Sequence, residues 1–519
     1  MLLQFRVGNF LSFNEIQTFS MEAGKVRNFS ERLYKDGKYK LLKFMSIYGA
    51  NASGKSNLVY AFSFFKDIVF SGFESGSYPH YCKLVEENKD KASFFEIKIE
   101  TNKKTFVYGF EVILNNSSLQ KEWLYEETKS EQKNYVFSRN ILDKKFTLGS
   151  YIKTNTLKDR INIYADDIKS DDSILFLKLM NQNKDNLYAT PSKITVFKDV
   201  YNWIRFKLTV TFPERPITNY SWMIDSNNLD VIAEKLNHFS TGIEKITVSN
   251  IAPEKVNSTL PKEIIKDIHN MLSEQKHNNK EGEKSHKPAV LIRSPENSMF
   301  IVSLNEEGMF KYKTLEFKHK NSNAKFSLED ESDGTVRLLD IIEILLNNDD
   351  NKVYIIDEIN RMFHPLLTIK FVEEFLELAK ERKIQLIVTT HESQLMDLKL
   401  LRKDEINFIN KDENGFSTIR SLDEFDDRFD KKIISEYFRG KYDAIPFPKN
   451  YFFTKVSLPL GSSVNRCAGS SPVARTKEKV GNIVLPTLFL YETKLGQDLK
   501  ATVKKQSGGL FLGRALMII

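Results

Sequence analysis

The chain has 519 residues, of which 41% are hydrophobic and 28% charged, and its formal net charge is +7. No run approaches the roughly 18 uninterrupted apolar residues of a membrane span, and the opening MLLQFRVGNF lacks the basic-then-apolar order of a secretory signal. The two cysteines, Cys82 and Cys467, lie far apart, which excludes a cysteine-built zinc site and favours a cytoplasmic protein.

The first predicted elements surround residue 50. Phe44-Met-Ser-Ile-Tyr48 predicts a buried strand, Asn57 to Phe70 predicts a helix, and Gly49-Ala-Asn-Ala-Ser-Gly54-Lys55-Ser56 between them has phosphate-loop spacing. Backbone N–H groups of such a loop curl around a phosphate, Lys55 would reach the terminal phosphates, and Ser56 would hold Mg²⁺. A chance glycine loop is the alternative, and the strand and helix on either side argue against it. The candidate nucleotide-binding residues are Gly49, Asn51, Gly54, Lys55, Ser56 and Asn57.

The middle of the chain predicts strands and then helices. Alternating apolar and polar residues from Phe94 to Leu124 predict an antiparallel sheet. Within it, Glu96-Ile-Lys98 could be mistaken for a nuclease motif, but ordinary strand alternation explains it better. Residues 276–288 lack apolar side chains and predict a loop. Amphipathic patterns predict a helical lid or arm at 173–182, 196–208, 227–239 and 261–274.

Farther along, Ser332-Asp333-Gly334-Thr335 opens an amphipathic helix, and Ser332 with Gly334 would form a second anion site at its N-terminus. The strand Val353-Tyr-Ile-Ile356 ends in Asp357-Glu358. Asp357 would orient Mg²⁺, and Glu358 would position or deprotonate an attacking water. The strand from Ile384 to Thr390 ends in His391, which can contact a terminal phosphate. Each motif alone is weak evidence, and their order and spacing make coincidence a poor explanation.

The C-terminal end differs from the rest. Residues 455–519 hold 10 Lys or Arg and 3 Asp or Glu, and the remaining 454 residues hold 66 of each, so the body is neutral. The stretch GSSVNRCAGSSPVART resembles a transfer-RNA gene read as protein. Residues 451–519 are therefore interpreted as a foreign or disordered tail, with an ordinary C-terminal extension as the alternative.

Taken in this order, the motifs resemble those of ABC-type ATPases in the branch that contains SMC, RecF and OLD (overcoming-lysogenisation-defect) proteins. The opening FRVGNFLSFNE and the stretch DEINRMFHP resemble that branch, and RKDEINFINKDENG with YFRGKYDAIPF resemble the ends of bacterial AAA-labelled ATPases of abortive-infection and phage-defence operons. The resemblance covers residues 1–125 and 325–447. The chain departs from the pattern at Asp443, where glycine is expected, and in a signature without glutamine.

The resemblance implies an α/β fold: a P-loop NTPase of the ABC-type head kind, with a mixed central sheet, an antiparallel side sheet and a helical insertion subdomain. The expected parts are 1–130 and 325–450 as halves of the head, 131–324 as the helical insertion, and 451–519 as the tail. It also implies ATP and Mg²⁺, a homodimer or higher even oligomer, and no membrane. Because the chain has no room for its own nuclease domain, a separate toxin or nuclease partner is expected. The leading interpretation is the ATP-hydrolysing sensor of a phage-defence system. DNA binding as a RecF-like repair ATPase, or a nucleotide-held scaffold with little turnover, is the alternative.

Overall fold

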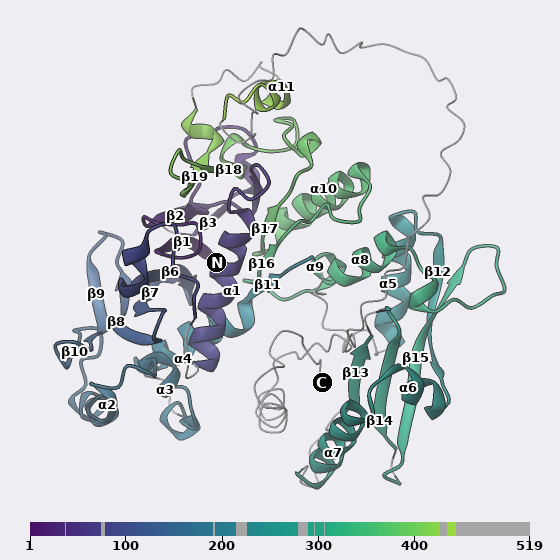
Figure 1. The fold of residues 1–519 in the computed structure, drawn as a ribbon, viewed down its shortest axis with the longest axis horizontal. Helices are drawn as coiled ribbons and strands as arrows, with labels where there is room; N and C mark the ends of the chain where they lie inside the picture. The colour runs from purple at the N-terminus through teal and green to yellow at the C-terminus, as the bar shows by residue number, and fades with distance from the viewer. Residues whose placement is uncertain are drawn as a thin grey trace. The chain divides into compact units, whose positions relative to one another are not determined.

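The computed structural model describes residues 1–36, 38–73, 78–189, 192–213, 226–278, 289–294, 296–305, 307–425 and 433–442. The chain divides into a first unit, Met1–Thr218 with Asp333–Pro446, and a second unit, Asn219–Ser332 with Phe447–Ile519 (Figure 1). Asp443 and the tail 451–519 lie outside the described residues. Within the described ranges, no helix combines the length and apolar character that crossing a membrane requires.

The first unit contains an antiparallel sheet of seven strands in the order β10-β9-β8-β7-β6-β1-β2. The side sheet expected from the alternation between Phe94 and Leu124 is therefore present, and it extends well beyond that segment. One face points to the core, since Phe106, Tyr108 and Phe110 are all buried. The strands are β1 (Leu2–Gly8), β2 (Gln17–Ser20), β6 (Ser93–Thr101), β7 (Lys104–Ile113), β8 (Ser118–Glu127), β9 (Lys133–Asn140) and β10 (Lys145–Leu148).

A second sheet of the first unit has six strands in the order β11-β16-β17-β5-β18-β19. The first five run parallel and β19 is antiparallel to β18, so the expected mixed sheet is confirmed. Because β5, β17 and β16 are parallel neighbours, their carboxyl ends meet at one edge. The strands are β5 (Phe44–Tyr48), β11 (Leu208–Thr211), β16 (Val353–Ile356), β17 (Gln385–Thr389), β18 (Ile406–Lys411) and β19 (Ser417–Ser421).

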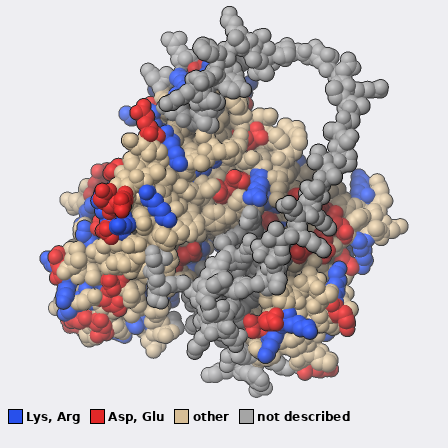
Figure 2. All heavy atoms as spheres, viewed as in Figure 1, with Lys and Arg blue, Asp and Glu red and all other residues tan. Residues whose placement is uncertain are grey.

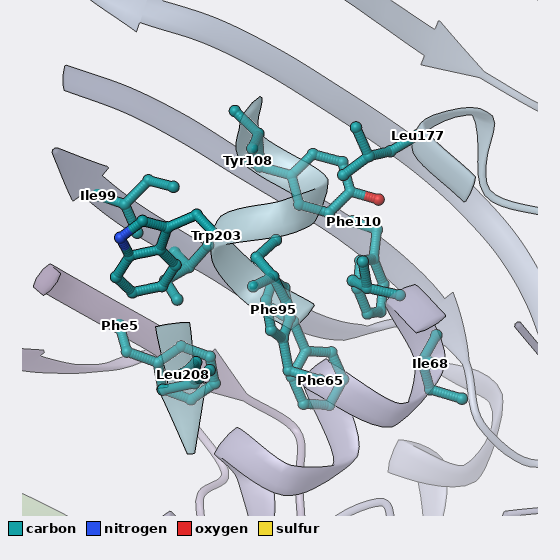
Figure 3. Packing of buried hydrophobic residues seen from close by; sticks show 14 of the residues in the cluster. Phe5, Phe65, Ile68, Phe95, Ile99, Tyr108, Phe110, Leu177, Trp203 and Leu208 are labelled. Carbon is teal, nitrogen blue, oxygen red and sulfur yellow. The ribbon is translucent and has the colours of Figure 1, made fainter. Parts of the chain in front are cut away.

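Helix α1 (Lys55–Ser71) packs against the antiparallel sheet through a layer of aromatic rings. Phe5 of β1 stacks on Phe62 with ring centroids 4.0 Å apart, and Phe65 stacks on Phe110 of β7 at 5.6 Å. Figure 3 shows the same cluster from close by, with Trp203 beside it. This packing fixes the helix that follows the phosphate loop, since offset aromatic pairs add about 0.5–1.5 kcal/mol each to the burial of their surface.

A buried ion pair ties the antiparallel sheet to the segment that follows it. Glu122 of β8 accepts hydrogen bonds from the backbone N–H groups of Phe176 (2.6 Å) and Leu177 (3.0 Å) and from the hydroxyl of Tyr108 (2.9 Å). Arg139 of β9 lies 3.8 Å from Glu122, and both side chains are fully buried. Burial raises the pKa of Glu122, and the Arg139 charge opposes that rise.

Figure 2 shows Lys and Arg interspersed with Asp and Glu on the face in view.

The first unit also contains short hairpin strands and further helices around these sheets. The hairpin is β3 (Tyr34–Asp36) with β4 (Tyr39–Leu41), and the helices are α2 (Asn155–Ile168), α3 (Phe176–Leu179), α4 (Thr195–Asn202), α8 (Asp333–Ile341), α9 (Glu343–Leu346), α10 (Pro365–Glu381) and α11 (Ile433–Phe438).

The second unit contains a sheet that the expectation of a helical insertion over residues 131–324 did not include. It contains an antiparallel sheet in the order β12-β15-β14-β13, made of β12 (Ile243–Asn250), β13 (Ala289–Arg293), β14 (Met299–Leu304) and β15 (Phe310–His319). The expected helices are present as α5 (Ser226–His238) and α7 (Lys262–Asn278), with α6 (Pro253–Thr259) between them. The strands were missed because half-exposed residues interrupt their apolar pattern, as in FKYKTLEFKH of β15. Of the expected loop 276–288, residues 279–288 lie outside the described residues.

Candidate functional site

The phosphate loop lies between β5 and α1, in the context that its spacing predicts. Helix α1 begins at Lys55, directly after Gly54, which has φ 113°. No side chain caps the helix N-terminus, and its first turn carries no acidic residue. A helix start of this kind presents N–H groups and a partial positive charge to an anion.

Glycine is required in this loop because other groups approach too closely. A Cβ on Gly49 would lie 2.3 Å from the carbonyl oxygen of Ile409, and one on Gly54 would lie 2.4 Å from Oγ of Ser417. The Ser417 hydroxyl donates to the carbonyl of Ser53, and its Oγ lies 2.7 Å from Oγ of Ser12, whose hydroxyl can donate to it. Two serines from distant parts of the chain, Ser12 and Ser417, therefore pack against the phosphate loop.

Asn57 joins the same support, because its Nδ2 donates to Oγ of Ser12 over 2.7 Å. Sequence reasoning placed Asn57 among the nucleotide-binding residues, and the structure shows its amide directed to Ser12. Ser12 and Ser417 were missed. Ser12 stands in the turn of FLSFN, and a polar residue among three apolar ones (Phe10, Leu11 and Phe13) was the available signal.

Lys55 is folded onto its own loop. Its Nζ donates to the carbonyl oxygens of Gly49 (2.9 Å) and Ala50 (3.0 Å). Burial lowers the pKa of Lys55, and the charges of Asp357 and Glu358 oppose that shift. The Lys55 ammonium is thus held at the phosphate loop by two carbonyl acceptors.

The residues of the loop fit the phosphates of ATP. The hydroxyl of Ser53 is buried and has no hydrogen-bond partner among the described residues. Ser56 and Asn51 are exposed, with Ser56 in the first turn of α1. An unused buried hydroxyl, an uncapped helix N-terminus and an ammonium on the same loop are what an anionic ligand requires.

Asp357 and Glu358 follow β16 and are held by Thr389 at the end of β17. The Thr389 hydroxyl donates to Oδ1 of Asp357 over 2.6 Å and accepts from the backbone N–H of Glu358 over 2.8 Å. Asp357 and Thr389 are buried. Glu358 has φ 49°, a left-handed conformation that costs a residue other than glycine about 1–2 kcal/mol. The Thr389 bond is one contact that holds this strained backbone in place.

His391 stands two residues beyond Thr389, at the same edge of the sheet. Desolvation and the Lys55 charge lower the pKa of His391, while Glu358 and Asp357 oppose that shift. Lys55 follows β5, Asp357 and Glu358 follow β16, and His391 follows β17, so all four stand at the carboxyl ends of neighbouring parallel strands. Parallel strands β5, β16 and β17 thus bring together groups that lie more than three hundred residues apart.

Asn360 and Thr389 are further residues of the site that sequence reasoning missed. Asn360 accepts hydrogen bonds from the residues directly after β17. Only a weak signal in the sequence pointed to either residue, because polar residues beside a motif commonly serve other purposes, such as capping a turn.

Ser332 directly precedes α8, and Gly334 lies in its first turn, so both stand at a helix N-terminus as expected. Their role toward the phosphates of a second subunit stays a prediction. Among the described residues, no group of three or more His, Cys, Asp and Glu side chains is placed to hold a metal ion. That Ser56 and Asp357 would hold Mg²⁺ together with nucleotide oxygens and waters stays a prediction.

Known structures with a similar backbone include heads of SMC proteins. One is an SMC head bound to the C-terminal winged-helix domain of ScpA, with 13% identity over 81% of this chain and 97% of the other, and a TM-score of 0.34. Another is the SMC head domain from Thermotoga maritima, with 14% identity over 81% and 98% of the two chains and a TM-score of 0.28. These scores are too low to support any inference, and the fold follows from the sheets themselves. No curated protein sequence matches this chain.

A protein-family model matches residues 44–397, well over half of the 519 residues. Its description reads "AAA domain, putative AbiEii toxin, Type IV TA system". The matched range runs from the strand before the phosphate loop, through Asp357 and Glu358, to just beyond His391. This protein therefore belongs to that AAA-domain family.

Proposed function

We propose that the chain binds ATP with Mg²⁺ and hydrolyses it. The observation that carries this proposal is the meeting of Lys55, Asp357, Glu358 and His391 at the carboxyl edge of three parallel strands, beside an uncapped helix N-terminus. Bound Mg²⁺ would neutralise charge on the transferred phosphoryl group.

The chain's own residues have separate roles in this scheme. The loop N–H groups and Lys55 bind the phosphates, and Ser56 with Asp357 orients the metal. Glu358 takes the proton of the attacking water, a contribution of roughly 10²–10⁴-fold. His391 donates a hydrogen bond to the terminal phosphate, and a lowered imidazole pKa keeps it largely neutral at physiological pH.

Two substitutions test these roles. Lys55→Ala should abolish ATP binding measured by calorimetry, while Glu358→Gln should retain binding and slow hydrolysis by roughly 10²-fold or more. Glu381→Gln, at the exposed C-terminal end of α10, is the matched control and should change neither. Hydrolysis by Glu358→Gln at the parental rate would refute the assignment of the general base.

We further propose that the active form is a dimer or a larger even assembly. Ser332 and Gly334 at the start of α8 would complete the phosphate site of a second subunit. ATP with Glu358→Gln should then trap the assembly, as measured by light scattering, and Gly334→Asp should prevent it by placing a carboxylate near the partner's phosphates. A strictly monomeric and fully active ATPase would contradict this proposal.

The cellular role that we propose is sensing or gating in cytoplasmic phage defence, with a separate toxin or nuclease as effector. The family's description, which names a putative AbiEii toxin and a type IV TA system, supports it. Phage plating on cells that carry the gene with its neighbours is the test, with Lys55→Ala as the inactive control. Unchanged plating together with sensitivity to DNA damage on deletion would favour the RecF-like role instead.

A further inference from the structure

Asn360 connects the loop after β16 with the loop after β17. Its Oδ1 accepts hydrogen bonds from the Thr390 hydroxyl (3.0 Å) and from the backbone N–H of His391 (3.2 Å). A backbone N–H can only donate, so the oxygen of the carboxamide, and not its nitrogen, faces His391. Asn360 lies two residues after Glu358, and the two loops are therefore joined beside the catalytic groups.

The other contacts of this loop constrain its backbone. Thr390 is buried and donates its N–H to the carbonyl of Ile47 at the end of β5, over 3.1 Å. Its hydroxyl also accepts from the N–H of Glu392 at 3.0 Å. The Thr390 hydroxyl, which donates to Asn360, is thus part of a chain of hydrogen bonds that involves the residues on both sides of His391. The His391 residue itself is exposed, so the direction of its ring depends on how its backbone is held.

We infer that Asn360 is a positioning residue, whose carboxamide oxygen holds the backbone of His391 so that the imidazole meets the terminal phosphate of bound nucleotide. This inference rests on the proposed ATPase function. Asn360 acts through His391 and through the loop, and it is not itself assigned a contact with the nucleotide.

The chemistry of the site explains why an amide suits this position. Among the described residues, the charges of Lys55, Glu358 and Asp357 act on the His391 imidazole. A carboxylate at position 360 would accept the same two hydrogen bonds, but it would add a third negative charge and favour the imidazolium form. A neutral amide holds the loop without changing the protonation of the histidine.

A double-mutant cycle on the full chain tests the inference through turnover. Asn360→Ala should lower kcat for ATP by about tenfold and change KM by less than about twofold, because the phosphate loop is untouched. The double variant Asn360→Ala/His391→Ala should be no slower than His391→Ala alone. Asn116→Ala removes an exposed turn asparagine that also accepts one backbone N–H, and as the control it should leave kcat unchanged. Losses that multiply in the double variant would overturn the inference.

A second measurement does not require turnover. The chain has 8 histidines, so the imidazole resonance of His391 can be assigned by its absence in His391→Ala. In Asn360→Asp, which retains both acceptors, the pKa of His391 should rise by about 0.5 or more. An unchanged titration would overturn the inference. Wild-type protein that hydrolyses no ATP would refute the proposed function, while this titration would still decide on Asn360.

Discussion

Thr389→Val removes a single buried hydroxyl while keeping the shape of the side chain nearly constant. That hydroxyl donates to the Asp357 carboxylate at 2.6 Å and accepts the N–H of Glu358 at 2.8 Å. A hydrogen bond to a charged group contributes about 1.5–3 kcal/mol and a neutral one about 0.5–1.5 kcal/mol. The variant should therefore lower the free energy of unfolding of the first unit by about 2–4 kcal/mol.

The chain offers a matched control in Thr368 of α10. Thr368 is as buried as Thr389, with both side chains at 0% exposure, yet its Oγ1 has no hydrogen-bond partner among the described residues. Thr368→Val makes the same chemical change without breaking a bond, so it should be neutral or stabilise by up to about 1 kcal/mol. Thr389→Ser keeps the hydroxyl and should lose only the burial of one methyl group, about 1 kcal/mol.

Urea unfolding followed by tryptophan fluorescence measures the effect, because Trp123 and Trp203 both lie in the first unit. ATP turnover should fall in Thr389→Val more than in Thr389→Ser, since Glu358 then loses the bond that holds its strained backbone. Equal stabilities of Thr389→Val and Thr368→Val would refute the reasoning that the Thr389 hydroxyl holds the two acidic residues.

Three further predictions follow from the fold. Gly54→Ala should abolish ATP binding, because the new Cβ would lie 2.4 Å from the hydroxyl of Ser417. Gly415 also has a positive φ, but a Cβ there would lie 3.5 Å from its nearest atom, so Gly415→Ala should lose only about 1–2 kcal/mol of stability. Arg139→Met leaves Glu122 buried without its cation and should cost about 3–5 kcal/mol at neutral pH. Because the folded-state pKa of Glu122 is raised, the folded state binds its proton more readily, so this loss should shrink as the pH falls toward about 5 in urea titrations. Deletion of residues 455–519, which lie outside the described residues, should leave the melting temperature and ATP turnover unchanged, and a drop of roughly 5 °C would show that the tail contributes to stability.

The sequence alone predicted the parts of the site that are local in the chain. The phosphate loop could be recognised because its glycines, Lys55 and Ser56 are neighbours, and because strand Phe44–Tyr48 and the helix after it have clear apolar patterns. The strand Val353–Ile356 ended at the predicted residue for the same reason. A buried parallel strand is almost wholly apolar, so the first acidic residue marks its end.

Contacts between distant segments could not be read in this way. Ser12 and Ser417 are 405 residues apart, and nothing in either local pattern predicts the bond between them. The same holds for Asn360, since its partners Thr390 and His391 belong to another strand of the sheet. The four-stranded sheet of the second unit was missed as well, because half-exposed strands lack a clear apolar period. Residue order determined which groups stand at the ends of the strands. The pairing of β5, β17 and β16 decided that those ends meet, because strand pairing depends on hydrogen bonds between segments that the sequence places far apart.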